Sequence, residues 1–358
     1  MARNNAPYRR HGRWHFKKVA ACLLIILCVY FVVSLLASAV AFRLIFHRSE
    51  RVEPSMEQDY LDVDPVRYPR RALSFPSGRN TLQGYLYGAG NSRGVVIVAH
   101  GLFGDADSHL AETLFFVDHG WTVFCFDATG TRGSTGSGTV GLSQMKLDLL
   151  AAIRFLEAEL PGQPLFLYGH SLGAYAAATV LNDCPEIRAA VCVAAFDSPV
   201  ETMYYHSRLR VGILAATGYP FLRLWNYVLF GSEADESAAE AISQTQVPVL
   251  LIQGSEDRTV PYAISLYAHR DALRDPNVES ILVEQPERNQ HSTLWRTQEG
   301  AAYYLRMCQA LDALRGGGTE TPPKDAAEAF DAQSDRAILY ALDPDFMDCV
   351  VDFFLRAA

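Results

Sequence analysis

Hydrophobic and polar positions divide the chain into one long apolar run near the N-terminus and a following region of short, alternating segments. No side chain carries a charge from Val19 to Phe42. A helix rises about 1.5 Å per residue, so about 24 residues span about 36 Å, more than the ~30 Å hydrocarbon layer of a bilayer. The pattern predicts a transmembrane anchor at residues 19–42.

The charges on either side of this run predict its orientation. By the positive-inside rule, the more basic flank, residues 1–18, is cytoplasmic and the bulk of the chain is extracytoplasmic. We therefore expect a single-pass protein of the cell membrane. The basic residues are Arg3, Arg9, Arg10, Arg13, Lys17 and Lys18 before the run, and only Arg43, Arg48 and Arg51 closely after it.

A cleaved signal peptide is the alternative interpretation of the same segment. Ala37-Ser38-Ala39 resembles the A-x-A cleavage site of such peptides. The apolar run is, however, longer than the ~7–15 residues of a typical signal-peptide core. This length favours an uncleaved anchor.

The pattern changes after the anchor. Residues 47–70 are polar and interrupted by prolines, which favours a stalk or a strap over residues 43–71 that lies along the domain. Residues 72–75 and 82–87 flank a turn-rich connection and predict an antiparallel hairpin. Residues 94–99 form a continuous apolar run, which is typical of a central strand covered on both faces.

From residue 110 onward, predicted helices and strands alternate. Such alternation is typical of a mostly parallel sheet with helices on both faces, so we expect one α/β domain at residues 72–358. The predicted helices are 110–119, 142–160 and 172–183, and the predicted strands are 121–126, 165–168, 187–196, 247–253 and 280–283.

Two stretches interrupt the alternation. Residues 200–243 are rich in aromatic side chains and compatible with helix where a short connection would suffice, which predicts a helical lid. Residues 316–334 begin with a Gly- and Pro-rich sequence and continue as an acidic segment, which predicts a flexible insertion. Residues 338–358 have large apolar side chains at helical spacing and predict a final helix that docks on the sheet.

Composition and charge argue against a nucleic-acid partner, a cysteine metal site and a disulfide framework. With 358 residues, 49% of them hydrophobic and 20% charged, the chain can bury a full core. Its formal net charge of -9 argues against nucleic acid as a partner, because phosphate binding requires clustered Lys and Arg. The seven cysteines follow no metal-ligand spacing and predict no disulfide framework.

The strongest chemical signal is Gly169-His170-Ser171-Leu172-Gly173, which lies between a predicted strand and a predicted helix. A Gly-x-Ser-x-Gly sequence in this setting is typical of a nucleophile elbow, in which the two glycines let the backbone turn sharply and expose the serine. Ser171 is therefore the expected nucleophile.

A serine hydroxyl needs a base within hydrogen-bond reach, and the base needs a carboxylate that orients it. Asp257 follows an apolar strand downstream of Ser171 and is the expected acid, with Glu256 and Asp197 as alternatives. His291 lies in a polar loop after the last predicted strand and is the expected base. His269 is less suitable because it falls within a predicted helix.

Two backbone N–H groups are expected to form an oxyanion hole, which stabilises the charge of a tetrahedral intermediate. The amide of Leu172 follows the nucleophile, and the amide of Leu102 lies in the loop after the 94–99 strand. His100 and His170 lie inside these two glycine-rich motifs. We interpret them as structural histidines.

These motifs together resemble the α/β-hydrolase superfamily, in its serine aminopeptidase-like (S33) and monoglyceride lipase-like esterase branch. The resemblance covers residues 72–358 apart from the 316–334 insertion. It implies an eight-stranded, mostly parallel sheet, a Ser-Asp-His triad and no cofactor. The loop from Asp127 to Ser134 also resembles a family loop, but Arg132 stands where a second glycine is usual.

The expected function is that of a membrane-anchored serine hydrolase, most consistent with a carboxylesterase or lipase-like enzyme. Its partners would be a small-molecule ester or acyl substrate and the membrane. One alternative is an S33-like aminopeptidase or acyltransferase, for which acidic residues such as Glu233, Asp235 and Glu236 could hold a substrate amine. An alternative from another class is a non-catalytic, membrane-tethered binding protein on a hydrolase scaffold.

Overall fold

One eight-stranded sheet organises the computed structural model, which describes residues 10–50, 56, 58–273, 277–316 and 322–358. The strand order is β1-β2-β4-β3-β5-β6-β7-β8. β2 is antiparallel to β1 and to β4, and the remaining neighbours are parallel, which confirms the expected α/β-hydrolase fold class. The strands are β1 Arg70–Ser77, β2 Asn80–Tyr87, β3 Val95–Ala99, β4 Thr122–Phe126, β5 Leu165–His170, β6 Ala189–Val193, β7 Val249–Gly254 and β8 Val278–Val283.

Helices cover both faces of this sheet, and the strands from β3 to β7 are therefore buried along their whole length. Ile97 of β3 packs in one core with α3, α4 and α7, whereas its neighbour Val98 packs in a second core with α2 and α11. The helices are α1 Arg10–Ile45, α2 Leu110–Asp118, α3 Gln144–Glu159, α4 Leu172–Thr179, α5 Pro199–Val211, α6 Ala215–Phe230, α7 Ala238–Gln244, α8 Gln298–Leu314, α9 Lys324–Gln333, α10 Arg336–Leu339 and α11 Pro344–Ala357.

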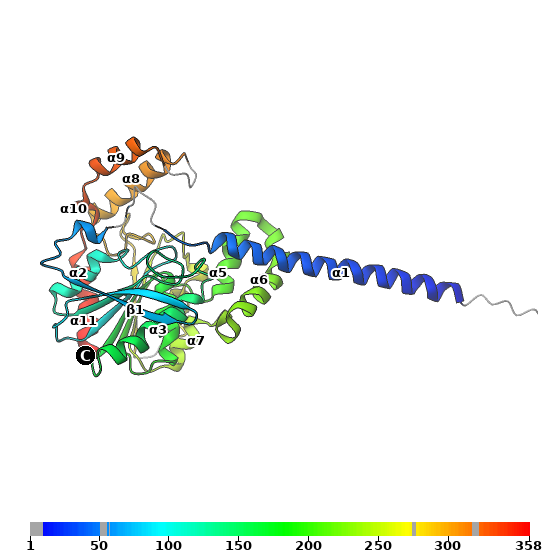
Figure 1. The fold of residues 1–358 in the computed structure, drawn as a ribbon, viewed down its shortest axis with the longest axis horizontal. Coiled ribbons are helices and arrows are strands. Elements are labelled where there is room, and N and C mark those ends of the chain that lie inside the picture. Colours follow the sequence, from blue (N-terminus) through cyan, green and yellow to red (C-terminus); the bar gives the residue numbers. More distant parts are fainter. Residues whose placement is uncertain (1–9, 51–55, 57, 274–276, 317–321) are drawn as a thin grey trace, which may run out of the picture.

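Helix α1 projects from the body (Figure 1). Its stretch Phe16–Ile45 is long and apolar enough to cross a membrane. The predicted anchor at residues 19–42 therefore lies within one continuous helix. The helix continues beyond it in both directions.

The segment after α1 is a strap rather than a free stalk. Phe42 and Phe46 are each 4% exposed and belong to the core on the α3 face. The amide of Ser49 donates to the carbonyl oxygen of Gly130 at 2.9 Å. Residues 51–55 and 57 lie outside the described part of the chain, and β1 begins at Arg70, two residues earlier than predicted.

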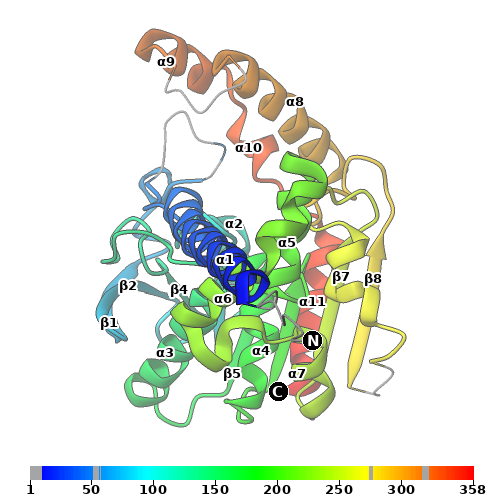
Figure 2. The same ribbon diagram turned by 90° about the vertical axis from the view of Figure 1, so that its right-hand side faces the viewer.

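The predicted lid forms a helical hairpin of α5, the short helix η3 (Gly212–Leu214) and α6, followed by the short helix η4 (Gly231–Asp235). Helix α7 ends the predicted lid range but belongs to the body, because Ala238 and Ile242 are buried in the core. In both views α5 and α6 lie beside the base of α1 (Figures 1 and 2).

The second half of the predicted flexible insertion contains a helix. Residues 317–321 lie outside the described part of the chain, but Lys324–Gln333 form helix α9. The chain after α9 is held to α8, because the amide of Asp335 donates to the Tyr303 hydroxyl at 2.7 Å. The expected final helix is α11, which begins later than predicted, where the Asp343 side chain accepts from the Phe346 amide.

Candidate active site

Ser171 lies between β5 and α4 with φ of 56° and ψ of -115°, a conformation that is strained for a residue with a side chain. The two flanking glycines are required sterically. A Cβ atom at Gly169 would overlap the backbone of Gly173, and one at Gly173 would overlap the carbonyl of Ala99. The local structure is therefore the sharp strand-to-helix turn that the sequence predicts around Ser171.

Asp257 and His291 form a hydrogen-bonded pair. The His291 Nδ1 lies 2.7 Å from Asp257 Oδ2, and because a carboxylate only accepts, Nδ1 carries the proton in this pair. The Asp257 carboxylate is buried, and its other oxygen accepts from the amides of Thr259 and Val260, both at 2.8 Å. The side-chain amide of Gln253 donates to Oδ2 at 3.2 Å. These contacts fix the carboxylate and orient the imidazole.

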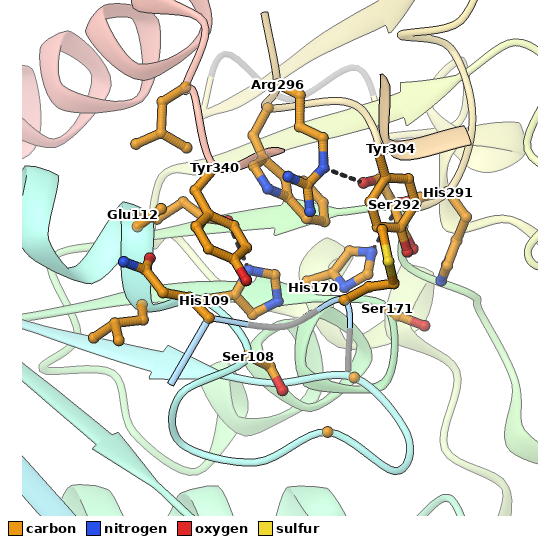
Figure 3. Close-up of a pocket in the computed structure, with 18 of the residues that line it drawn as sticks. Ser108, His109, Glu112, His170, Ser171, His291, Ser292, Arg296, Tyr304 and Tyr340 are labelled. Carbon is orange, nitrogen blue, oxygen red and sulfur yellow. Dashed lines mark hydrogen bonds and ion pairs between the residues drawn. The ribbon is translucent and has the colours of Figure 1, made fainter. Parts of the chain in front are cut away.

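Ser171 and His291 line the same pocket, which has a volume of about 470 Å³ (Figure 3). The structure thus brings all three expected triad residues to one edge of the sheet. Their roles as nucleophile, acid and base stay predictions.

The alternative acids have other contacts. Asp197 Oδ1 accepts from the Ser237 hydroxyl and the Ala239 amide, both at 2.8 Å, and so caps α7. Glu256 lines a separate hollow on the protein surface. His269 lies 3.7 Å from Asp197 and does not line the pocket of Ser171. This geometry favours Asp257 over the alternatives.

The loop that carries Leu102 approaches the serine closely. A Cβ atom built at Gly101 would lie 3.4 Å from the Ser171 Cβ. Leu102 and Leu172 both line a small adjoining cavity. The next residue, Phe103, has a positive φ of 64°, and its carbonyl oxygen accepts from the Ser49 hydroxyl at 2.9 Å. The contact from the strap was not expected from the sequence.

The structure supports the structural interpretation of His100. Burial lowers its pKa to about 4, so the ring is neutral. Its Nδ1 lies 2.7 Å from the carbonyl oxygen of Gly101, and its Nε2 accepts from the Ala128 amide at 3.2 Å. This pair of partners requires the neutral Nδ1–H tautomer. The ring thus links the loop after β3 to the loop after β4.

His170 is also held neutral. Burial, with a smaller effect of nearby His291, holds the pKa of His170 well below its usual range. Its Nε2–H donates to the backbone carbonyl oxygen of His291 at 3.0 Å. His170 is thus a support for the loop that carries the expected base.

The pocket wall also contains charged side chains that the sequence did not reveal. The buried Arg296 guanidinium lies 4.4 Å from the centre of the Tyr304 ring and donates to the carbonyl oxygen of Ser292 at 3.1 Å. Burial lowers the pKa of Arg296. His109 and Glu112 form a buried pair at 2.7 Å in the same wall, where the His109 ring centre lies 5.1 Å from that of Trp295 (Figure 3).

No aromatic side chain of the lid is among the described residues that line the pocket. The described lining residues come from the strap, the loop after β3, α2, the elbow, the loop after β7, the His291 loop, α8 and the chain after α10. The lid reaches only the rim, where His206 of α5 lies 3.0 Å from the carbonyl oxygen of Thr259. No local pattern predicts these wall residues, because they converge from segments that are distant in sequence.

Comparisons with known proteins bear on the fold and on the family. Residues 90–226 match the model of the serine aminopeptidase S33 family. That range contains the Ser171 elbow and the Leu102 loop but ends before Asp257 and His291. The acylamino-acid-releasing enzyme of Rattus norvegicus is 29% identical over 178 residues, which are 44% of this chain and 23% of that enzyme. The match thus spans about a quarter of that relative's length.

Among solved structures, two crystal forms of an esterase from Pyrococcus furiosus have the same fold. Each superposes with a TM-score of 0.54, at 18% and 19% sequence identity. They cover 75% of this chain, and 97% and 98% of the esterase. The comparisons confirm the resemblance to the α/β-hydrolase superfamily and to its S33 branch.

Proposed function

We propose that this chain, an α/β-hydrolase of the serine hydrolase family, is a membrane-anchored carboxylic ester hydrolase that acts through an acyl-enzyme on Ser171. The observation that carries the proposal is the Asp257–His291 pair at 2.7 Å beside the pocket that Ser171 lines. In our proposal α1 crosses the cell membrane with its N-terminus in the cytoplasm. The catalytic domain is then extracytoplasmic.

In the proposed mechanism, His291 Nε2 takes the proton of the Ser171 hydroxyl as its oxygen attacks the ester carbonyl. Asp257 accepts from Nδ1–H and stabilises the imidazolium that forms. The amides of Leu102 and Leu172 stabilise the oxyanion, and each such donor contributes about 3 kcal/mol in the transition state. His291 then protonates the leaving alcohol, and a water molecule, deprotonated by His291, releases the acid and restores Ser171.

The aminopeptidase or acyltransferase alternative is supported by the S33 family match and by the relative that releases acylamino acids. An aminopeptidase needs carboxylates near the serine to hold a substrate amine. Glu233 and Glu236 lie within 2.6 Å and 2.5 Å of Lys146, and neither lines the Ser171 pocket. Asp235 accepts from Ser198 at 2.7 Å. These three residues thus stabilise the lid. Glu112, the carboxylate that does line the pocket, is paired with His109 at 2.7 Å. This arrangement favours ester substrates.

The alternative of a non-catalytic binding protein requires no oriented base. A binding scaffold would not need the contacts that fix Asp257 and His291 against each other, nor the strained conformation of Ser171. Both are present here, which favours catalysis.

The test is labelling with a fluorophosphonate, read by mass spectrometry. The full chain in detergent is the appropriate sample, because Phe42 and Phe46 belong to the core. We expect one adduct on Ser171 and none in Ser171→Ala, with labelling slowed by at least ~100-fold in His291→Ala. Ser243→Ala, which changes an exposed hydroxyl of α7, is the matched control and should label normally.

Substrate class is then tested with p-nitrophenyl esters beside aminoacyl p-nitroanilides. We expect kcat/KM to be higher for the esters than for the matching anilides after correction for their uncatalysed rates. Higher corrected values for anilides with a free amine would favour the aminopeptidase. A folded wild type that neither labels nor turns over would favour the binding protein.

A further inference from the structure

The lid hairpin packs against the candidate membrane-spanning helix. The Phe221 ring of α6 lies 5.5 Å from the ring centres of both Tyr30 and Phe31 of α1. The Tyr30 hydroxyl donates to the carbonyl oxygen of Thr217 at 3.3 Å. Figure 2 looks toward α1 and shows α6 against it.

The position of this contact along α1 is informative. Tyr30 and Phe31 lie at the middle of the uncharged run from Val19 to Phe42. The residues from Val19 to Tyr30 form only about 18 Å of helix, little more than half of a ~30 Å hydrocarbon layer. A bilayer crossed by α1 therefore also surrounds the part of α1 that α6 touches.

The domain cannot move away from the bilayer on a long spacer. Phe42, the last residue of the uncharged run, is already 4% exposed in the hydrolase core. Arg48 donates to the carbonyl oxygens of Ser134 and Gly136 at 2.8 Å and 3.1 Å, which fixes the strap to the loop after β4. The position of α1 in the bilayer therefore fixes how deep the lid lies in the bilayer.

The outer surface of the lid hairpin is apolar. Ile213 at its tip is 86% exposed, and Val228 of α6 is 60% exposed. Exposed apolar side chains gathered on one element favour contact with lipid. Arg208 and Arg210 at the end of α5 have long side chains that can reach lipid phosphates. The other exposed apolar residues of the hairpin are Leu209, Val211, Leu214, Leu224, Tyr227 and Leu229.

The pocket opens next to the strap and the lid. Phe103 lines the pocket and stacks on His47, whose ring centre is 5.3 Å away and which follows the end of α1 by two residues. Thr259, on the rim, contacts His206 of α5. The rim therefore lies close to where α1 leaves the hydrocarbon layer.

We propose that the α5–η3–α6 hairpin is a second membrane-inserted element, immersed in the leaflet on the side of the hydrolase domain. The pocket then opens at the bilayer surface, and its substrates are amphiphilic esters drawn from the membrane. The pocket receives the carboxyl end of the ester beside Ser171, while the rest of the acyl chain stays in the leaflet. This inference rests on the proposed anchor and on the proposed esterase activity.

Insertion is measured by nitroxide-lipid quenching of a fluorophore on a single cysteine. The full chain is reconstituted in phosphatidylcholine–phosphatidylglycerol vesicles. In one background, Cys22, Cys28, Cys308 and Cys349 are replaced by Ser, and the label is placed by Ile213→Cys or Val228→Cys. In a second background Cys22 is kept and only Cys28, Cys308 and Cys349 are replaced, so that a label on Cys22 reports on α1 itself. Val66→Cys is the control, because Val66 is 88% exposed and its neighbour Arg67 pairs with Asp118 at the end of α2, away from α1 (Figure 1).

We expect lipids with a nitroxide on the acyl chain to quench the labels at 213, 228 and 22 at least ~2-fold more than the label at 66. Quenching at 22 without quenching at 213 and 228 would overturn the inference and leave the anchor intact. No quenching at 22 would overturn the anchor and the inference together. Fluorophosphonate labelling of the same samples reports separately on the proposed hydrolase.

Delivery of the substrate from the membrane is tested with a double variant that carries Ile213→Glu and Val228→Glu. We expect turnover of a long-chain ester embedded in vesicles to fall at least ~10-fold, while turnover of a soluble short-chain ester changes less than ~2-fold. Val66→Glu is the matched control and should leave both rates unchanged. Equal rates on the vesicle ester for wild type and the double variant would contradict delivery from the membrane.

Discussion

The Ser49 hydroxyl donates to the carbonyl oxygen of Phe103 at 2.9 Å and so joins the segment after α1 to the loop that carries the Leu102 amide. Phe103 has a positive φ of 64°, a conformation that needs support from its surroundings. The strap that follows α1 is thus in direct contact with the proposed oxyanion loop.

Removing this contact should slow catalysis more than it weakens binding. A net hydrogen bond contributes about 0.5–1.5 kcal/mol, so Ser49→Ala is expected to lower kcat by about 2- to 10-fold with KM nearly unchanged. The measurement is steady-state ester hydrolysis by the full chain. The control is Ser243→Ala; a Ser49→Ala enzyme with the kcat of that control would show that the strap does not position the loop.

Asp257→Asn should reduce kcat by about 10³- to 10⁴-fold while the protein remains folded. An amide group at the position of Oδ2 would donate to Nδ1, so His291 would carry its proton on Nε2 and could not accept from Ser171. Steady-state kinetics with circular dichroism as a folding check measures this effect. Asp118→Asn, a change in a surface ion pair, is the control, and a loss below ~10-fold at Asp257 would argue against its role.

Phe46→Ala should destabilise the hydrolase domain by about 3–5 kcal/mol, because truncation of a buried Phe leaves a cavity. The same change at Phe16, which is exposed on α1, should cost close to nothing. The two variants are compared by thermal unfolding, with the loss of ester hydrolysis as the readout. Equal unfolding temperatures would mean that the strap is a spacer rather than part of the core.

His100 should make stability depend on pH. Burial lowers its folded-state pKa to about 4, below the ~6.5 of an exposed histidine. The unfolded chain therefore takes up a proton first, and the stability contributed by the neutral ring is full above pH ~6.5 and is lost between pH ~6.5 and ~4. The difference of about 2.5 pH units corresponds to about 3 kcal/mol.

Other groups titrate in this interval. Burial of His170 acts in the same direction, whereas burial raises the pKa of Asp127 to about 6, so that acidification stabilises the fold through that carboxyl. The comparison is therefore between wild type and His100→Gln by chemical denaturation at pH 7.5, 6 and 5. We expect the difference in free energy of unfolding between wild type and His100→Gln to shrink as the pH falls. A difference that stays constant would contradict the assignment of a neutral, buried His100.

The sequence by itself determined the parts that depend on short-range pattern. Apolar runs of strand length and the turn around Ser171 predicted the sheet and the elbow, because local sterics require Gly169 and Gly173 there. Asp257 and His291 could be selected because each follows a strand, and the carboxyl ends of parallel strands meet at one edge of a sheet.

The tertiary structure alone decided what covers that edge. The strap docks through Phe46 and Ser49, Phe221 of the lid packs on α1, and Arg296 and Glu112 reach the pocket from two distant segments. Each of these contacts joins residues that are far apart in the chain. Periodicity reports which face of an element is apolar, but it does not report which partner that face meets.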